Sequence, residues 1–291
     1  MAFVRFEDSG SEGRGYAPIV SLKTQPATAA GAAPTSRRSA STEDGGLGVL
    51  QARPDGPARR LAASVDANAA VVFTVVMLAG LLVIAAASIG AGLLITRVIE
   101  HAWGIGAADE RVNVWLAAHR TPGRTHASLI GSIVAGGVVL PILVAVLAVA
   151  CAVLRKWRVA AFVVFALAVE AATYRITTLV VHVHRPRVVR LEHLPVNASY
   201  PSGHTAASVA VYGGLALLVT SRFQSNVVRG LVWTFAVLMV AFVALSRMYR
   251  GMHHPLDVGG GLLVGVAALA VLVFACRVAG AAYDRRHGGE A

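Results

Sequence analysis

Charged side chains are scarce in this sequence of 291 residues: Asp, Glu, Lys and Arg make up 14% of it, whereas 56% of the residues are hydrophobic. Soluble globular domains carry about 25% charged residues. The shortage therefore excludes an ordinary soluble domain. The composition favours an integral membrane protein.

Cysteine is rarer still, with 2 in the chain. Cys151 and Cys276 both lie in apolar stretches, and their spacing is not that of metal ligands. We interpret them as small buried apolar residues, with a disulfide or a reactive thiol as the alternative.

Acidic residues are outnumbered by basic ones, and the formal net charge is +11. Most of the positive charge is arginine, whose planar guanidinium group suits phosphate. Nucleic acid is the obvious rival partner for such a chain. Several arginines lie between long apolar runs rather than on a basic, water-exposed domain, so we expect membrane lipid phosphate and no nucleic acid as the partner.

Residues 1–63 lack a sustained apolar pattern and are rich in Gly, Ser, Ala, Pro and Arg. This composition predicts a disordered tail, followed by a membrane domain over residues 64–291. No apolar core of a secretory signal follows Met1, so we expect the tail to be retained and the first span to act as the insertion signal. A cytoplasmic tail is favoured by the basic residues just before that span, Arg53, Arg59 and Arg60.

Long apolar runs follow the tail. A helix needs about 20 apolar residues to cross a bilayer, and the sequence holds roughly six such runs. We therefore predict an all-α fold, an integral membrane bundle of about six transmembrane helices. The runs are Ala69–Ile95, Ala127–Leu154, Val159–Val183, His204–Ser221, Gly230–Leu245 and Leu256–Val278.

Between the first two runs, apolar residues recur at helical spacing in the segment Asp109–His119. The pattern predicts a helix. Its role stays open between an interfacial amphipathic helix and a connecting helix packed on the bundle.

Basic loops set the expected orientation. With the tail in the cytoplasm, the basic groups around Arg155, Arg222 and Arg285 also lie in the cytoplasm, as the positive-inside rule requires. The loops around Arg185 and Arg247 then face the extracytoplasmic side. Topology does not explain arginine there, but phosphate binding does, because guanidinium groups can neutralise phosphate oxygens.

The loop between the fifth and sixth runs combines residues suited to nucleophilic catalysis. His253 and Asp257 are four residues apart, and Pro255 is favoured in a first helical turn, so both side chains are expected on one face. The carboxylate can then accept from one imidazole nitrogen and leave the other free as a nucleophile. His254 lacks this relation to Asp257, so we assign the nucleophile to His253 and a secondary role to His254.

A second segment, Pro201–His204, predicts a tight turn into a helix, whose free N–H groups favour an anion. Ser202 can donate or cap, and Gly203 allows close approach of the backbone. His204 can protonate a leaving group and then activate water. Each of these features alone is often only a helix cap or an interfacial anchor, but three such segments on one expected membrane face indicate a phosphate site.

These motifs make the sequence resemble the type 2 phosphatidic acid phosphatase (PAP2) superfamily over roughly Ala69–Val278. The third family motif reads Ser-Arg, five residues, His, three residues, Asp, and it is matched by Ser246, Arg247, His253 and Asp257. The second, Pro-Ser-Gly-His, is matched by Pro201–His204. The first reads Lys, six residues, Arg-Pro, and here Arg185 and Pro186 match while Thr178 stands in place of the lysine.

The resemblance implies a six-helix membrane fold and a phosphohistidine mechanism that uses no metal and no cofactor. In that scheme His253 attacks the phosphate, Asp257 orients it and His204 is the acid. The residues that hold phosphate are Arg185, Ser202, Gly203 and Arg247.

The substitution at Thr178 removes one cation from this scheme. Arg175 lies three residues earlier on nearly the same helix face, and we expect it to restore the charge. The alternative is an arginine that faces a polar gap or the interface. Glu170 is another ionisable residue inside a span, and the sequence names no partner for it.

The sequence therefore predicts a multi-pass membrane phosphatase of the cell membrane with an extracytoplasmic active site. The expected substrate is a lipid phosphate monoester or pyrophosphate, such as phosphatidic acid, phosphatidylglycerol phosphate or a polyprenyl (for example undecaprenyl) phosphate or pyrophosphate. The alternatives are a lipid phosphotransferase with the same histidine chemistry, and a non-catalytic lipid-phosphate binder or transporter, which the missing lysine motivates.

Overall fold

The structure, a computed structural model, describes residues 47–99, 101 and 104–288. Within these residues the chain is helical and forms no strand beyond one isolated bridge, between Val183 and Ala198. The predicted all-α membrane fold is confirmed. The helices are α1 (Pro57–Ser64), α2 (Ala69–Leu94), α3 (Ile105–Ala118), α4 (Pro122–Val134), α5 (Val139–Val153), α6 (Trp157–Val180), α7 (Gly203–Ser208), α8 (Gly214–Thr220), α9 (Asn226–Tyr249) and α10 (Pro255–His287), with short segments η2 (Gly48–Leu50), η3 (Ile95–Ile99) and η4 (Val209–Gly213).

In the described part, 5 helices are long and apolar enough to cross a membrane, and the bent pair α4–α5 raises the number to 6. The predicted run Ala127–Leu154 is thus not one straight helix, because α4 and α5 meet at 43°. Gly136 and Gly137 lie at the break. Glycine weakens a helix interior, which accounts for the bend.

Apolar side chains cover the outside of the spans as well as the core. Leu82 on α2, Leu238 on α9 and Leu263 on α10 are all exposed, with Leu263 at 70%. Such exposure is expected where lipid, and not water, surrounds a helix.

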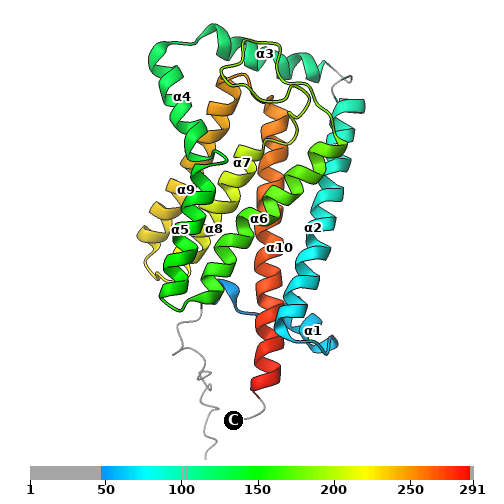
Figure 1. The fold of residues 1–291 in the computed structure, drawn as a ribbon, viewed down its shortest axis with the longest axis vertical. Helices are drawn as coiled ribbons and strands as arrows, with labels where there is room; N and C mark the ends of the chain where they lie inside the picture. The colour runs from blue at the N-terminus through cyan, green and yellow to red at the C-terminus, as the bar shows by residue number, and fades with distance from the viewer. Residues whose placement is uncertain (1–46, 100, 102–103, 289–291) are drawn as a thin grey trace, which may run out of the picture. The chain divides into compact units, whose positions relative to one another are not determined.

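Figure 1 shows α10 running the length of the bundle, and it packs against α2, α6 and α7. Small residues allow the closest of these contacts. An added Cβ would lie 2.3 Å from the Tyr200 ring at Gly260 and 2.5 Å from the Ser202 carbonyl oxygen at Gly261. These glycines therefore let the turn into α7 lie directly on the first turns of α10.

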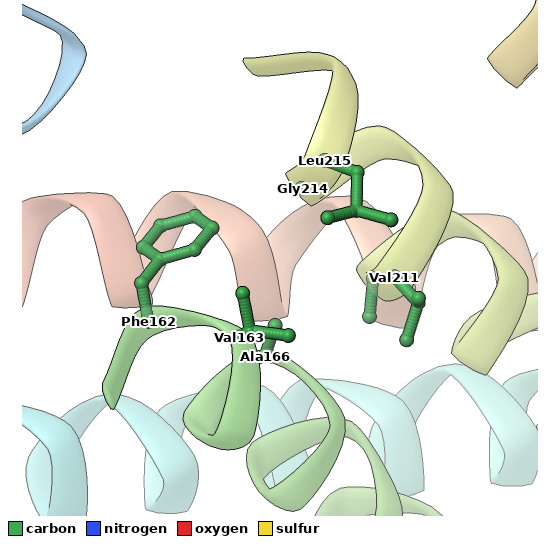
Figure 2. Close-up of a pocket in the computed structure, with 7 residues that line it drawn as sticks. Phe162, Val163, Ala166, Val211, Gly214 and Leu215 are labelled. Carbon is green, nitrogen blue, oxygen red and sulfur yellow. The ribbon is translucent and has the colours of Figure 1, made fainter. Parts of the chain in front are cut away.

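A small pocket between α6 and the η4–α8 segment lies in the apolar core (Figure 2). Its lining is apolar throughout and comprises Phe162, Val163, Ala166, Ala210, Val211, Gly214 and Leu215. The pocket offers no group that could bind or process a phosphate.

Part of the predicted tail has structure. Residues 1–46 lie outside the described residues, whereas η2 and α1 lie on α10. Ala58 and Ala62, one helical turn apart, are buried against a cluster that includes Ala282 of α10. Two alanines make a narrow contact face, which explains why the sequence showed no apolar pattern there.

The predicted helix Asp109–His119 is α3, which crosses the end of the bundle where α9 ends and α10 begins (Figure 1). Its inner face buries Asp109 and Asn113, whereas Trp115 is 59% exposed. The interpretation as a packed connecting helix is therefore confirmed for the inner face. The outer face keeps the exposed aromatic residue expected of an interfacial helix.

Candidate active site

The three predicted segments meet at the end of the bundle that α3 crosses (Figure 1). Arg185, in the loop after α6, donates to the carbonyl oxygen of Met252, in the α9–α10 connection. Ser202, in the turn into α7, donates its backbone N–H to the Asp257 carbonyl oxygen at 2.9 Å. Segments far apart in the sequence thus form one polar site.

His253 is buried in this site, with 2% of its surface exposed. Its Nδ1–H donates to the carbonyl oxygen of Ser199 at 2.7 Å. Burial lowers the pKa of His253 well below its usual value, and the nearby charges of Arg247, Arg185 and His204 lower it further. The imidazole is therefore neutral at physiological pH, and its Nε2 atom keeps a lone pair that no hydrogen bond within the described residues uses.

The predicted hydrogen bond between Asp257 and the His253 ring is absent. Asp257 Oδ2 lies 3.9 Å from His253 Nδ1, too far for a hydrogen bond. Instead Oδ2 accepts from Ser199 Oγ at 2.5 Å and from the backbone N–H of His254 at 2.8 Å. Asp257 is the third residue of α10, where a carboxylate readily turns back to bond the residue before the helix.

His254 is more closely tied to Asp257 than predicted. Its Nδ1 lies 3.4 Å from Asp257 Oδ2, and its Nε2 lies 3.0 Å from Glu110 Oε2 on α3. Burial lowers the pKa of His254, but the hydrogen bond and charge of Asp257, then Glu110, outweigh burial and raise that pKa to about 9. His254 is thus a cation at neutral pH that joins α3 to the start of α10.

His204 lies half-buried in the first turn of α7, and its side chain makes no hydrogen bond within the part of the chain described. It is within electrostatic range of Arg247, Glu192 and Arg185. It also interacts electrostatically with His253. Both ring nitrogens of His204 remain available to a ligand or to water beside the other histidine.

Ser202 and Gly203 have roles in packing the turn. The Ser202 hydroxyl lies 2.9 Å from the Thr205 hydroxyl and makes no side-chain cap of α7, contrary to one of its predicted uses. A Cβ added at Gly203 would lie 3.1 Å from the Tyr174 ring. The absence of a side chain at Gly203 therefore allows α6 and the turn to approach closely.

Arg247 is fully buried and presents two donors without partners. Its Nη1 donates to both carboxylate oxygens of Glu192, at 2.9 and 2.8 Å, and to the Ser132 hydroxyl. Its Nε and Nη2 atoms are buried and make no hydrogen bond to any of the residues that the structure describes. Unsatisfied buried donors are rare, and this edge of the guanidinium has the geometry that binds two oxygens of a phosphate.

Arg185 is used mainly to hold the loops. Its Nε donates to the Pro195 carbonyl oxygen at 2.7 Å and its Nη2 to that of Ala198 at 2.9 Å, in addition to the bond to Met252. Its charge still acts on His204 and His253. Arg185 therefore fixes the backbone around the site, with its remaining N–H groups left for a ligand.

The structure does not bring Arg175 to the other predicted residues. Its side chain is exposed on α6, and no described contact links it to the site. The residue of α6 that reaches the site is its neighbour Tyr174, which packs on Gly203 and interacts electrostatically with Arg185 and Arg247. The side chains of adjacent helical residues point about 100° apart, which separates the two positions.

Several residues of the site are not identified by the sequence motifs. The Asn113 side chain on α3 donates to the carbonyl oxygens of Met248 and His253, at 3.1 and 2.9 Å. Glu192 contacts Arg247 through the ion pair described above. Both partners of Asn113 are backbone atoms, which leave no mark in a side-chain motif.

Among the described residues, no His, Cys, Asp or Glu side chains gather in a group that could hold a metal ion.

The family model described as the PAP2 superfamily matches residues 159–279, a segment that contains all the motif residues above. Among curated proteins, sphingosine-1-phosphate phosphatase 2 of Homo sapiens is 42% identical over 90 residues, which are 31% of this chain and 22% of that protein. The undecaprenyl-diphosphatase of Sulfolobus acidocaldarius is 39% identical over 75 residues, which are 26% of this chain and 32% of that protein. The matched residues thus span less than a third of either relative.

A solved structure resembles the fold. It is that of a transmembrane PAP2-type phosphatidylglycerolphosphate phosphatase from Bacillus subtilis, with a TM-score of 0.55 and 22% sequence identity. The similarity covers 68% of this chain and 92% of that one. It shows a shared membrane-spanning helical fold.

Proposed function

We propose that this chain is a multi-pass membrane phosphatase of the PAP2 superfamily, which hydrolyses a lipid phosphate monoester or pyrophosphate. One observation carries the proposal: the neutral, buried His253 has a free Nε2 atom in a site where Arg247 offers two unpartnered buried donors. A nucleophile and a vacant phosphate-binding edge are what phosphoryl transfer to a protein side chain requires.

In the proposed reaction, His253 Nε2 attacks phosphorus and the bond to the leaving oxygen breaks. His204 gives its proton to that oxygen, so the lipid leaves as an alcohol or, from a pyrophosphate, as a monophosphate. The Nδ1–H bond to the Ser199 carbonyl oxygen stabilises the positive charge that the His253 ring gains. Water then attacks the phosphohistidine with His204 as the base, releasing phosphate and restoring both histidines.

Arg247 would hold two phosphate oxygens through Nε and Nη2, with Arg185 adding positive charge. These contacts matter most in the transition state, where charge on the phosphoryl oxygens is stabilised in a buried site. The names of the relatives, a sphingosine-1-phosphate phosphatase and an undecaprenyl-diphosphatase, support a lipid as the leaving group.

We also propose that the site opens on the extracytoplasmic side of the cell membrane. The connections α5–α6 and α8–α9 and the end of α10 lie at the opposite end of the bundle from α3 (Figure 1). Those connections carry basic residues, among them Arg155, Arg222 and Arg285. The positive-inside rule favours the cytoplasm for that end.

The test is phosphate release by the full chain in detergent. We expect inorganic phosphate from phosphatidic acid, sphingosine-1-phosphate or undecaprenyl pyrophosphate, and little from the water-soluble glycerol 3-phosphate. His253→Ala should lose at least about a thousandfold in kcat, the scale for removal of a nucleophile. Phosphate binding without release from any lipid would identify a binder, and transfer of phosphate to an added lipid alcohol without release would identify a phosphotransferase.

A further inference from the structure

Three polar side chains on the Nη1 side of Arg247, those of Glu192, Ser132 and Arg250, belong to none of the motifs. Together with Arg247 they form a group that we call the Glu192 clamp. Glu192 lies in the loop between α6 and α7, Ser132 on α4, and the two arginines at the end of α9. The clamp therefore joins three parts of the chain at the site.

The contacts within the clamp are short. Glu192 Oε2 lies 2.8 Å from Arg247 Nη1, and Glu192 Oε1 lies 2.5 Å from Arg250 Nε. The Ser132 hydroxyl donates to Glu192 Oε1 at 2.7 Å. Each arginine is buried, whereas the Glu192 side chain is 23% exposed.

Glu192 decides which edge of Arg247 faces a ligand. A guanidinium group can bind a phosphate through either of two edges. Because Nη1 is held by Glu192 and Ser132, the Nε–Nη2 edge is the one left open, and neither of its nitrogens has a partner among the described residues. Without Glu192, rotation about the side-chain torsions would offer other edges at similar cost.

Glu192 also sets the charge behind the phosphate. Burial alone raises the pKa of Glu192, but the charge and hydrogen bond of Arg247, together with hydrogen bonds from Ser132 and Arg250, lower that pKa to about 2. Glu192 is therefore an anion throughout the physiological range. It offsets part of the attraction that the buried arginines exert on any phosphate bound nearby.

These two effects act on different steps of the reaction. We propose that Glu192 is a positioning residue, which aims Arg247 at the transferring phosphoryl group and keeps the site from holding the released phosphate too tightly. The expected effect on kcat rests on the proposed function. The expected effect on the Kd for inorganic phosphate does not require that the protein turn over a substrate.

The experiment compares Glu192→Gln with the wild-type full chain in detergent. Gln keeps the size and one acceptor but removes the charge. We expect the Kd for inorganic phosphate, measured by calorimetry, to fall about tenfold as an opposing charge is removed. We expect kcat on a lipid phosphate to fall by about tenfold to a hundredfold, with KM unchanged or lower, because the transition-state donor is misaligned.

His193→Gln is the matched control. It changes the next residue of the same loop, whose side chain is exposed and makes no hydrogen bond or ion pair within the described part. It should leave Kd and kcat as in the wild type. Equal changes in His193→Gln and Glu192→Gln would overturn the proposal, as would weaker phosphate binding or an unchanged kcat in Glu192→Gln.

A second variant decides the matter if Glu192→Gln does not fold. Glu192→Asp keeps the charge and shortens the reach, so it should lower kcat while leaving the phosphate Kd near the wild-type value. An unchanged kcat in Glu192→Asp overturns the positioning role. If the wild type releases phosphate from no lipid, the proposed function fails, and the phosphate Kd values still test the clamp.

Discussion

Asp257 Oδ2 lies 3.9 Å from His253 Nδ1, and Ser199 links the two residues. The Ser199 carbonyl oxygen accepts from His253 Nδ1–H, and the Ser199 hydroxyl donates to Asp257. The carboxylate therefore acts on the imidazole through a backbone segment rather than by direct contact. A carboxylate used in this way stabilises the position of the ring, and the tautomer is set by a neutral carbonyl group.

This arrangement makes Ser199 and Asp257 one unit. We expect Asp257→Asn to lower kcat by about tenfold to a hundredfold and Ser199→Ala to lower it less, since the Ser199 carbonyl oxygen remains. The double variant should lose no more than Asp257→Asn alone, because coupled residues are not additive. Steady-state kinetics on a lipid phosphate measures all of these, and additive losses would contradict the shared role.

The bridge from α3 to α10 should make stability depend on pH. The pKa of His254 is raised to about 9, so its contribution is fully present below its ordinary value of 6.5 and is lost as pH rises through 9. The shift corresponds to roughly 3 kcal/mol at most. The melting temperature of the wild type should therefore fall between pH 7 and pH 10.

Glu110→Gln tests the source of this dependence, since it removes one of the two acids that contact His254. The variant should melt below the wild type at pH 7, and the two should converge at pH 10. Asp66→Asn, which removes an exposed partner of Arg286, is the control and should behave as the wild type. A constant difference between Glu110→Gln and wild type across the range would rule out His254 as the titrating group.

The cation missing at Thr178 can be examined with neighbouring residues of α6. Because Arg175 is exposed and makes no described contact with the site, Arg175→Ala should change kcat by about twofold or less. Tyr174→Phe should lower kcat by about tenfold, since it removes a hydroxyl that interacts with Arg185 and Arg247. The reverse order of effects would restore Arg175 to the role first expected of it.

Membrane orientation can be read from cysteine labelling. In a background with Cys151 and Cys276 replaced by Ala, a cysteine at the exposed Val189 should react with an impermeant maleimide added to intact cells. A cysteine at the exposed Phe223, in the α8–α9 connection, should react only after permeabilisation. The opposite pattern would place the site in the cytoplasm.

The spans and the three motif segments could be read from the sequence because both signals are local. An apolar run such as that of α2 needs no partner to be recognised. The bend at Gly136 could also have been predicted, because two adjacent glycines favour a break in a helix. The segment α1 was not, because its contact face is made of Ala58 and Ala62, which are no more apolar than the residues of a flexible tail.

The hydrogen-bond partners in the site could not be predicted from the sequence, for a different reason. His253 bonds to a backbone carbonyl oxygen of Ser199, which any residue type could supply. Glu192 lies in a loop without regular pattern, and only the fold brings it to Arg247. Helical phase likewise failed to separate Arg175 from Tyr174, because the sequence did not show which face of α6 meets the turn into α7.

The Asn113 amide has a consequence for what a minimal protein must contain. It lies before residue 159, where the family match begins, yet it donates to the backbone on both sides of the α9–α10 connection. Ser132 and Glu110 also precede the match and also contact the site. A chain cut down to residues 159–279 would keep every reacting side chain but lose the hydrogen-bond donors and acceptors that hold those side chains in place. Such a chain would contain all of the family motifs and would still be inactive.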